Sequence, residues 1–92
     1  MHPVIRTTIV ISNKLGLHAR ASAKLTKLAG SFRSEVHLVR TGRRINAKSI
    51  MGVMMLAAGL GTEIQIETEG EDAQAAMDAI RALIEDRFGE GE

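Results

Sequence analysis

Two hydrophobic periods follow each other in residues 63–88, EIQIETEGEDAQAAMDAIRALIEDRF. Residues 63–68 alternate between polar and apolar, which is typical of a strand with one face buried and the other in water. The apolar residues after them recur at helical spacing and form one stripe: Ala73, Ala76, Met77, Ile80, Leu83, Ile84 and Phe88. A half-buried strand followed by a one-sided helix predicts a sheet that is covered by helices on one face.

The same two periods place the other elements. We expect, in order, a strand at 5–11, a helix at about 18–29, a strand through 36–38, a short strand at 43–47 and a short helix after Ser49. The Thr41-Gly42 turn makes the two middle strands a hairpin, and Gly30 suits the end of the first helix. The order βαββαβα predicts an α+β fold, a two-layer open-faced sandwich in which a four-stranded antiparallel sheet carries three helices on one face.

The composition is typical of one domain spanning residues 1–92, since 45% of the chain is apolar and only the last four residues, GEGE at 89–92, look frayed. The chain has no Cys and its three His are far apart, so we expect no metal site and no cofactor. It shows neither a signal-peptide pattern nor an apolar run long enough to span a membrane, which favours a cytoplasmic location without a membrane partner.

Charge is distributed unevenly along the chain. Residues 1–48 hold ten Lys or Arg and one acid, whereas residues 49–92 hold two Arg and ten acids. A basic half can indicate a nucleic-acid-binding domain, which is the alternative function from another class. Two Phe and no Tyr or Trp leave no stacking platform for single strands, and no recognition-helix motif is evident, so we expect no nucleic-acid partner.

His18 lies where a loop becomes a helix, in LGLHAR at 15–20. The first amides of a helix lack intrahelical acceptors and the helix dipole adds positive charge there, so this end can bind an anion. Gly16 allows a tight loop, and the guanidinium of Arg20 can hold phosphate oxygens. An imidazole beside such a site can act as a nucleophile and carry a phosphoryl group. The alternative interpretation is that His18 only caps the helix.

Two segments carry a family resemblance. GLHARASAKL at 16–25 and NAKSIMGVMML at 46–56 closely resemble the HPr family, the histidine-containing phosphocarriers of the bacterial phosphotransferase system, and the nitrogen-branch carriers are also similar. The resemblance covers nearly the whole chain. It implies a phosphoryl carrier that is a substrate of other enzymes and not an enzyme itself, and we expect it to be a monomer.

The resemblance implies roles for three residues. His18 matches the histidine that accepts a phosphoryl group on Nδ1 from enzyme I, with phosphoenolpyruvate as the ultimate donor, and passes it to an EIIA-type protein. Arg20 matches the arginine that assists this transfer. Ser49 matches the regulatory serine that an HPr kinase/phosphorylase modifies in many bacteria. The sequence fits a carrier for sugar uptake and equally a nitrogen-branch regulatory carrier.

Ser49 and Ala21 each leave a question open. A serine that begins a helix is a good N-cap, worth about 1 kcal/mol, and this is the structural interpretation of Ser49. Within the matching segment we favour a phosphorylation site. Ala21 departs from the family, in which most members have Pro; its amide N–H could point at the phosphate or bond water.

A docking surface for partner proteins is expected around these residues. A Met-rich stretch at helical spacing often belongs to a core, but the second helix is short and some of its apolar side chains must face outward. The expected docking residues are Leu17, Ala21, Lys24, Lys27, Lys48, Ile50, Met51 and Met54, with the lysines as a positive rim around the site. We assign Val53 and Leu56 to the core, His37 to the solvated face of a strand and His2 to a mobile terminus.

Overall fold

The computed structural model describes residues 2–92, and its elements follow the predicted order. The strands are β1 (Ile5–Val10), β2 (Glu35–Arg40), β3 (Arg43–Asn46) and β4 (Glu63–Glu69). The helices are α1 (Ala19–Gly30), α2 (Ile50–Met55) and α3 (Ala73–Glu85), followed by the single 3₁₀ turn η1 (Arg87–Gly89). The predicted α+β class and the βαββαβα order are therefore confirmed.

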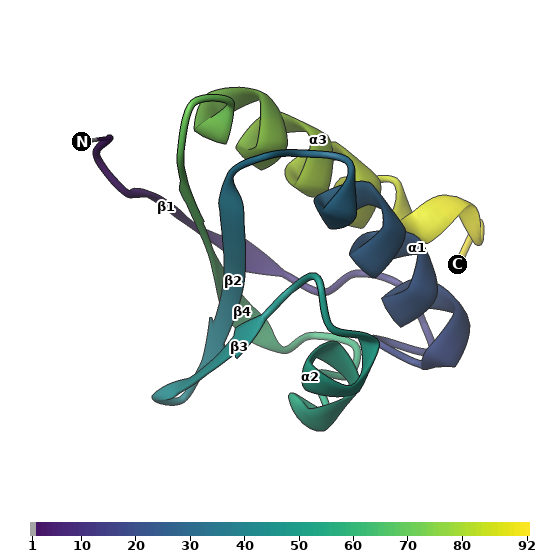
Figure 1. Ribbon diagram of the computed structural model, residues 1–92. Helices are drawn as coiled ribbons and strands as arrows, with labels where there is room; N and C mark the ends of the chain where they lie inside the picture. Colours follow the sequence, from purple (N-terminus) through teal and green to yellow (C-terminus); the bar gives the residue numbers. More distant parts are fainter. Residues whose placement is uncertain (1) are drawn as a thin grey trace.

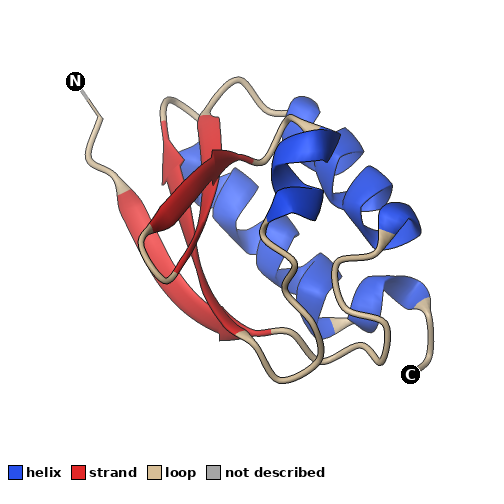
Figure 2. Ribbon diagram, turned by 90° about the horizontal axis from the view of Figure 1, so that it is seen from below, coloured by secondary structure: helices blue, strands red, loops and turns tan. Residues whose placement is uncertain are grey.

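The four strands form one antiparallel sheet in the order β1-β4-β2-β3. Figure 1 shows the helices on one face of this sheet, and Figure 2 shows the two layers from below. The alternation in β4 explains this arrangement, because Ile64 and Ile66 are buried under the helices while Glu63 and Gln65 are exposed on the open face. The predicted two-layer open-faced sandwich is confirmed.

The core lies between the two layers. α1 contributes Leu25, α3 contributes Ile80, and the sheet contributes Leu38, all fully buried. Val53 of α2 and Leu56 at its end are buried in the same cluster, which confirms their assignment to the core.

Two hydrogen bonds, one between backbone groups and one from a side chain to the backbone, set how α1 and α2 meet. Leu17, just before α1, donates its N–H to the carbonyl of Ala58, just after α2 (2.9 Å). Lys48, before α2, donates from Nζ to the carbonyl of Phe32, beyond the end of α1 (2.9 Å). The beginning of α1 is therefore next to the end of α2, and Ser49 lies at the opposite end of α2.

The last helix is shorter than its apolar stripe. The sequence predicts a helix that runs through Phe88, but α3 ends at Glu85 and Phe88 belongs to η1. Arg87 and Phe88 have φ angles of 55° and 56°, in the left-handed region that a right-handed helix cannot contain. Phe88 is nevertheless buried. The spacing of the stripe thus predicted burial correctly, while the helix itself stops one turn earlier.

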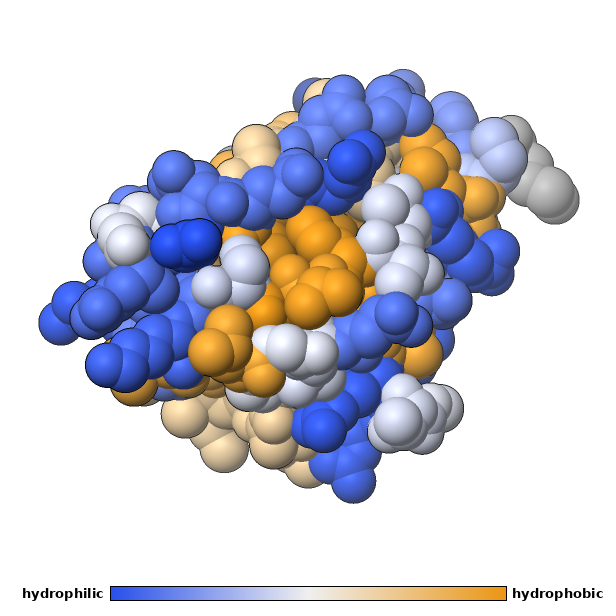
Figure 3. Space-filling model, turned by 180° about the vertical axis from the view of Figure 1, so that it is seen from behind, coloured by the Kyte–Doolittle hydropathy of each residue, from blue (hydrophilic) through white to orange (hydrophobic). Residues whose placement is uncertain are grey.

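Some apolar surface remains on the side away from the view of Figure 1. Figure 3 shows an apolar area there that is framed by hydrophilic residues. Several apolar side chains pack against the core and are only partly buried: Ile5, Ile9, Leu28, Phe32, Ile45 and Leu83. Within residues 2–92 no helix combines the length and the apolar character that crossing a membrane requires.

Candidate functional site

The loop before α1 is held in one shape by a glycine and an asparagine. Gly16 has a φ of 63°, and a Cβ there would lie 2.5 Å from the Ala58 carbonyl oxygen, so only glycine fits. The side-chain amide of Asn13 donates to the Gly16 carbonyl (2.8 Å), and the Gly16 N–H donates to the Asn13 carbonyl (3.2 Å). These contacts fix the direction in which the chain enters the helix at His18.

His18 is the N-cap residue of α1. Its carbonyl accepts the N–H of Ser22 (2.8 Å), and the Ser22 hydroxyl donates to the carbonyl of Leu17 (3.0 Å). The His18 side chain makes no capping hydrogen bond, which contradicts the interpretation of this residue as only a cap. The N–H groups of residues 19–21 have no intrahelical acceptors and lie at the positive end of the helix dipole.

A pocket of about 450 Å³ opens at this end of the helix. It is lined by Lys14, Leu15, His18, Ala19, Arg20, Glu90 and Glu92. Arg20 is exposed, and in the part of the chain that the structure describes it takes part in none of the ion pairs. The pocket therefore combines a free guanidinium with the first amides of α1, which together can hold an anion.

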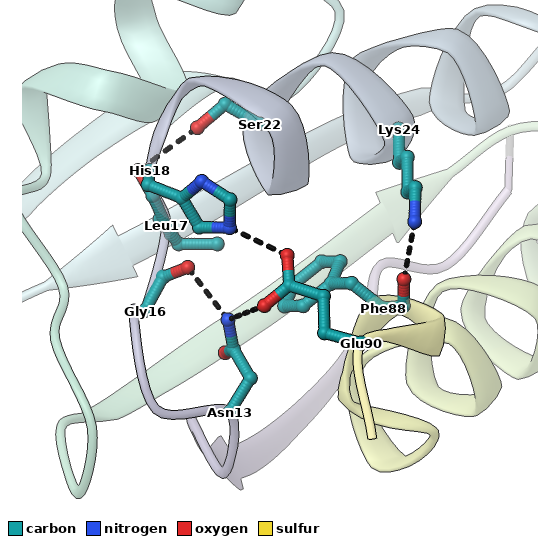
Figure 4. Close-up of polar contacts among 8 residues, drawn as sticks. All are labelled: Asn13, Gly16, Leu17, His18, Ser22, Lys24, Phe88 and Glu90. Carbon is teal, nitrogen blue, oxygen red and sulfur yellow. Dashed lines mark hydrogen bonds and ion pairs between the residues drawn. The ribbon is translucent and has the colours of Figure 1, made fainter. Parts of the chain in front are cut away.

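Glu90 is the partner of the His18 ring (Figure 4). Its Oε2 lies 2.5 Å from His18 Nε2, and its Oε1 accepts a hydrogen bond from Asn13 Nδ2 (3.0 Å). The side chain of His18 is 26% exposed and that of Glu90 is 12% exposed. The Asn13 amide, and after it His18, hold the pKa of Glu90 below its ordinary value, so this group is a carboxylate near neutral pH. In Figure 4 the other ring nitrogen of His18 points toward the first turn of α1.

The C-terminal segment is anchored at this site. Lys24 Nζ donates to the Phe88 carbonyl (2.6 Å), and the Lys14 N–H donates to the Glu92 carbonyl (3.0 Å). The sequence predicts a frayed end at 89–92, and the structure differs, because these bonds and the burial of Phe88 hold the segment against the loop before α1. Sequence reasoning missed Glu90 and Glu92 as residues of the site. The one signal that could have indicated them is their negative charge, which is opposite to that of the basic loop and helix.

Ser49 caps α2, as the sequence predicts. Its hydroxyl accepts the N–H of Gly52 (3.2 Å), and the residue is exposed. α2 has six residues, or about 9 Å at 1.5 Å per residue, and its far end adjoins the residue before His18. Ser49 is therefore not a part of the pocket at His18, and the structure keeps the two candidate phosphorylation sites apart.

Two of the predicted docking residues are buried. Leu17 is 6% exposed and Ala21 is fully buried in the core cluster. Ala21 lies on the stripe of α1 that faces the sheet, and Leu17 packs where α1 and α2 meet. The structure contradicts the expectation that their side chains face a partner. The amide of Ala21 remains among the first-turn N–H groups of α1.

The three lysines of the expected rim do not lie together. Lys24 and Lys27 are exposed on α1, and Lys24 is tied to the C-terminal segment. Lys48 bonds to the Phe32 carbonyl beyond the end of α1, whereas His18 caps its beginning. Because α1 has 12 residues, or about 18 Å of helix, Lys48 lies far from the pocket.

The apolar residues of α2 that the sequence predicts to dock partners are exposed. Ile50, Met51 and Met54 are 39%, 66% and 41% exposed, which suits a surface that contacts other proteins. Met55 on α2 and Leu15 in the loop before α1 are exposed as well, at 58% and 66%. Sequence reasoning missed these two, since nothing in the local pattern separates them from core positions.

The open face of the sheet carries a separate polar cluster. Glu67 accepts from Arg6 Nε (3.0 Å) and from Arg44 Nε (2.9 Å), and Arg44 also lies 3.2 Å from His37 Nδ1. The hydrogen bond from Arg44 is the main cause of a lowered pKa at Glu67. His37 therefore lies on the face away from the helices, as the sequence predicts, and in contact with an arginine.

Comparisons with known proteins give one consistent family. The model of the family described as "PTS HPr component phosphorylation site" matches residues 5–86. The phosphocarrier protein HPr of Cupriavidus necator is 67% identical over 86 residues, which are 94% of this chain and 94% of that protein.

Solved structures show the same fold. The crystal structure of HPr-C-His from Thermoanaerobacter tengcongensis matches with a TM-score of 0.91 at 41% identity, covering 94% of this chain and 97% of that one. An HPr dimer from the same organism matches with a TM-score of 0.77 at 42% identity, covering 91% of this chain and 97% of that one.

Proposed function

The chain belongs to the HPr family of phosphocarrier proteins, and from this membership we propose that His18 accepts a phosphoryl group from enzyme I and passes it to an EIIA-type protein. Phosphoenolpyruvate is the ultimate donor in this scheme. The observation that carries the proposal is the position of His18, which ends the loop at the start of α1 with one ring nitrogen toward the first helical turn.

The surroundings of His18 supply what a phosphoryl carrier needs. Phosphoryl transfer depends mainly on alignment and on stabilising charge, so a small scaffold suffices when the partner enzymes supply the rest. The amides of residues 19–21 and the guanidinium of Arg20 would hold the oxygens of the phosphoryl group. The nucleophile is the imidazole, whose phosphorylated form is reactive enough to pass the group on.

Labelling tests this assignment. We expect the protein to take up label from phosphoenolpyruvate in the presence of enzyme I, and the label to be lost in acid, because phosphohistidine is acid-labile and phosphoserine is not. His18→Ala abolishes the labelling, while Ser49→Ala serves as the matched control and keeps it. Acid-labile label in His18→Ala at the wild-type level contradicts the proposal.

Ser49 is the proposed regulatory site, as a substrate of an HPr kinase/phosphorylase. It is exposed at the start of α2, and the exposed side chains of Ile50, Met51 and Met54 follow it directly. A phosphate there would add nearly two negative charges beside this apolar surface. It would therefore act on the docking of acidic partners and not on the chemistry at His18.

The proposed carrier works in the cytoplasm as a monomer, and its acceptor defines its branch. The same site can serve a sugar-uptake carrier or a nitrogen-branch carrier, because His18 and Arg20 would have the same roles whichever EIIA-type protein accepts the phosphoryl group. Transfer of label to purified EIIA-type proteins of each branch distinguishes them. Size-exclusion chromatography tests the monomer, with a dimer like that solved for the Thermoanaerobacter tengcongensis protein as the contrary result.

A further inference from the structure

We propose that Glu90 is a positioning residue for phosphoryl transfer: its carboxylate accepts the Nε2–H of His18 and thereby leaves Nδ1 as the unprotonated nucleophile. This inference rests on the proposed function, because it takes His18 as the phosphoryl acceptor. It adds a residue that lies 72 positions away in the sequence and outside the stretch matched by the family model.

The contact between the two side chains is held from both sides. Glu90 Oε2 lies 2.5 Å from His18 Nε2, and Glu90 Oε1 is bonded to the amide of Asn13 at 3.0 Å. Asn13 is fully buried and also bonds to the Gly16 carbonyl, so it is a fixed support. The carboxylate is thus oriented by the same residue that shapes the loop before His18 (Figure 4).

The backbone of the C-terminal segment is shaped for this contact. Arg87 and Phe88 both have a left-handed φ, which costs free energy for residues other than glycine. The burial of Phe88 and the bond from Lys24 Nζ to its carbonyl hold this conformation. Two residues later the chain delivers Glu90 to the His18 ring. Such a costly backbone conformation persists only where the surrounding contacts determine it.

The carboxylate decides which ring nitrogen carries the proton. In a neutral imidazole one nitrogen is a donor and the other an acceptor, and a carboxylate only accepts. The Nε2 that faces Glu90 must therefore bear the hydrogen, and Nδ1 keeps its lone pair. Figure 4 shows this second nitrogen directed toward the first turn of α1, where the phosphoryl oxygens would be held.

The transfer step then balances without a further reactant. The Nδ1 lone pair attacks phosphorus on the phosphohistidine of the donor protein, a new N–P bond forms, and the donor's N–P bond breaks with its electron pair returning to the donor ring. The Nε2 proton stays where it is, so the phosphorylated ring of His18 gains positive charge. The Glu90 carboxylate faces that charge and stabilises it.

Glu92 provides a matched control. It lines the same pocket and carries the same charge as Glu90, but within residues 2–92 its side chain forms no hydrogen bond and no ion pair. In the part of the chain that the structure describes, the one hydrogen bond of Glu92 is through its backbone carbonyl, which accepts the Lys14 N–H. Glu90→Ala and Glu92→Ala therefore remove the same charge from the pocket, and only the first removes the partner of the imidazole.

The first measurement is the ring tautomer, from the ¹⁵N chemical shifts of the imidazole, recorded over a pH series and read where they no longer change with rising pH. We expect the Nε2–H form to dominate in the wild type and in Glu92→Ala, and a mixture with the Nδ1–H form in Glu90→Ala. An unchanged tautomer in Glu90→Ala overturns the inference. This result does not require enzyme I, so it stands even if His18 is not the phosphoryl acceptor.

The second measurement is the rate of phosphoryl transfer from phosphorylated enzyme I. Loss of the outer partner that orients a metal-ligating histidine typically costs about 10–100-fold in affinity or activity, and we expect a fall of that order in kcat for Glu90→Ala with KM unchanged. Glu92→Ala retains the wild-type kcat. A wild-type kcat in Glu90→Ala, with the fold intact by circular dichroism, overturns the positioning role. A wild type that takes up no label overturns the proposed function instead.

Discussion

His18 is set apart from the other histidines by what its ring contacts. Its Nε2 faces a carboxylate and its second nitrogen faces the first turn of α1, so one side is supported and the other is free. His37 has Nδ1 beside the guanidinium of Arg44 on the open face of the sheet, away from the helix end at which a phosphoryl group could be held. The chemistry therefore depends on the residues at each nitrogen and not on the imidazole alone.

Gly16 is the residue on which the position of His18 depends most directly. We expect Gly16→Ala to lower the free energy of unfolding by about 2–3 kcal/mol, because a left-handed φ is unfavourable for alanine and its Cβ would lie 2.5 Å from the Ala58 carbonyl oxygen. Urea denaturation measures the loss. Gly61→Ala is the control, since Gly61 has a φ of 85° but nothing within 4 Å of an added Cβ. Equal losses in the two variants would show that the contact with Ala58 contributes nothing.

At the scale of the element, α1 and α2 use their ends differently. Within residues 2–92 no side-chain hydrogen bond from the N-cap residue His18 closes the first turn of α1, whereas the first turn of α2 is closed by the Ser49 hydroxyl. The end of α2 is closed too, by Arg40, which donates to the carbonyls of Leu56 and Ala57 (2.7 and 2.9 Å). A helix of six residues is marginal alone, so these caps explain how α2 persists while several of its apolar side chains face water.

The two roles of Ser49 can be separated by two substitutions. Ser49→Ala removes the cap, and we expect it to lower the free energy of unfolding by about 1 kcal/mol while transfer from enzyme I stays intact. Ser49→Asp keeps a capping oxygen and adds negative charge, so we expect a stability close to wild type and slower transfer at low enzyme I concentration. Urea denaturation and transfer assays on both variants check this crossed pattern. Unimpaired transfer by Ser49→Asp would remove the argument for a charge switch.

At the scale of the whole molecule, the basic half of the chain is not one docking field. Arg6 and Arg44 hold Glu67 on the open face of the sheet. Arg40 and Arg43 donate to carbonyls at the end of α2. These four arginines stabilise contacts between distant segments of the fold. Few of the basic residues are therefore available to contact a partner or a phosphoryl group, and Arg20 is one of them.

Asp72 links two distant parts of the fold and makes stability depend on pH. Its carboxylate accepts from the Ser34 hydroxyl (2.5 Å), the Ser34 N–H (2.8 Å) and the Arg33 N–H (2.9 Å), which join the start of α3 to the loop before β2. The bond from the Ser34 hydroxyl is the main cause that lowers the pKa of Asp72 from 3.8 to about 2. A group with a depressed pKa in the folded state stabilises above its unfolded value and loses that contribution as the pH falls.

We therefore expect the free energy of unfolding to decrease as the pH falls from about 4 to about 2, the range between the ordinary and the lowered pKa of Asp72. Asp72→Asn makes this decrease smaller, and the lowered pKa values of Glu67 and Glu90 leave part of it in place. Urea denaturation at a series of pH values measures the slope. Asp78→Asn is the control, because Asp78 is exposed on α3 and, within residues 2–92, its side chain is bonded only to Gln74. Parallel slopes for Asp72→Asn and the wild type would contradict the assignment.

The sequence by itself determined the elements and their faces. Alternation in β4 and the stripe of α3 are local properties that report which side of each segment is buried, so the two layers followed from them. The place of His18 at a helix start followed from the helical spacing of apolar residues in the helix expected at about 18–29. The same reasoning overextended α3 through Phe88, because burial at helical spacing does not require helical backbone.

Only the tertiary structure decided what surrounds His18. Leu17 and Ala21 are buried because the beginning of α1 packs against the end of α2, a contact that no periodicity encodes. Glu90 reaches the imidazole because the chain reverses at Phe88 and returns to a loop 72 residues earlier in the sequence. Such pairings depend on how whole elements pack, and packing is a property of the assembled core and not of any one segment.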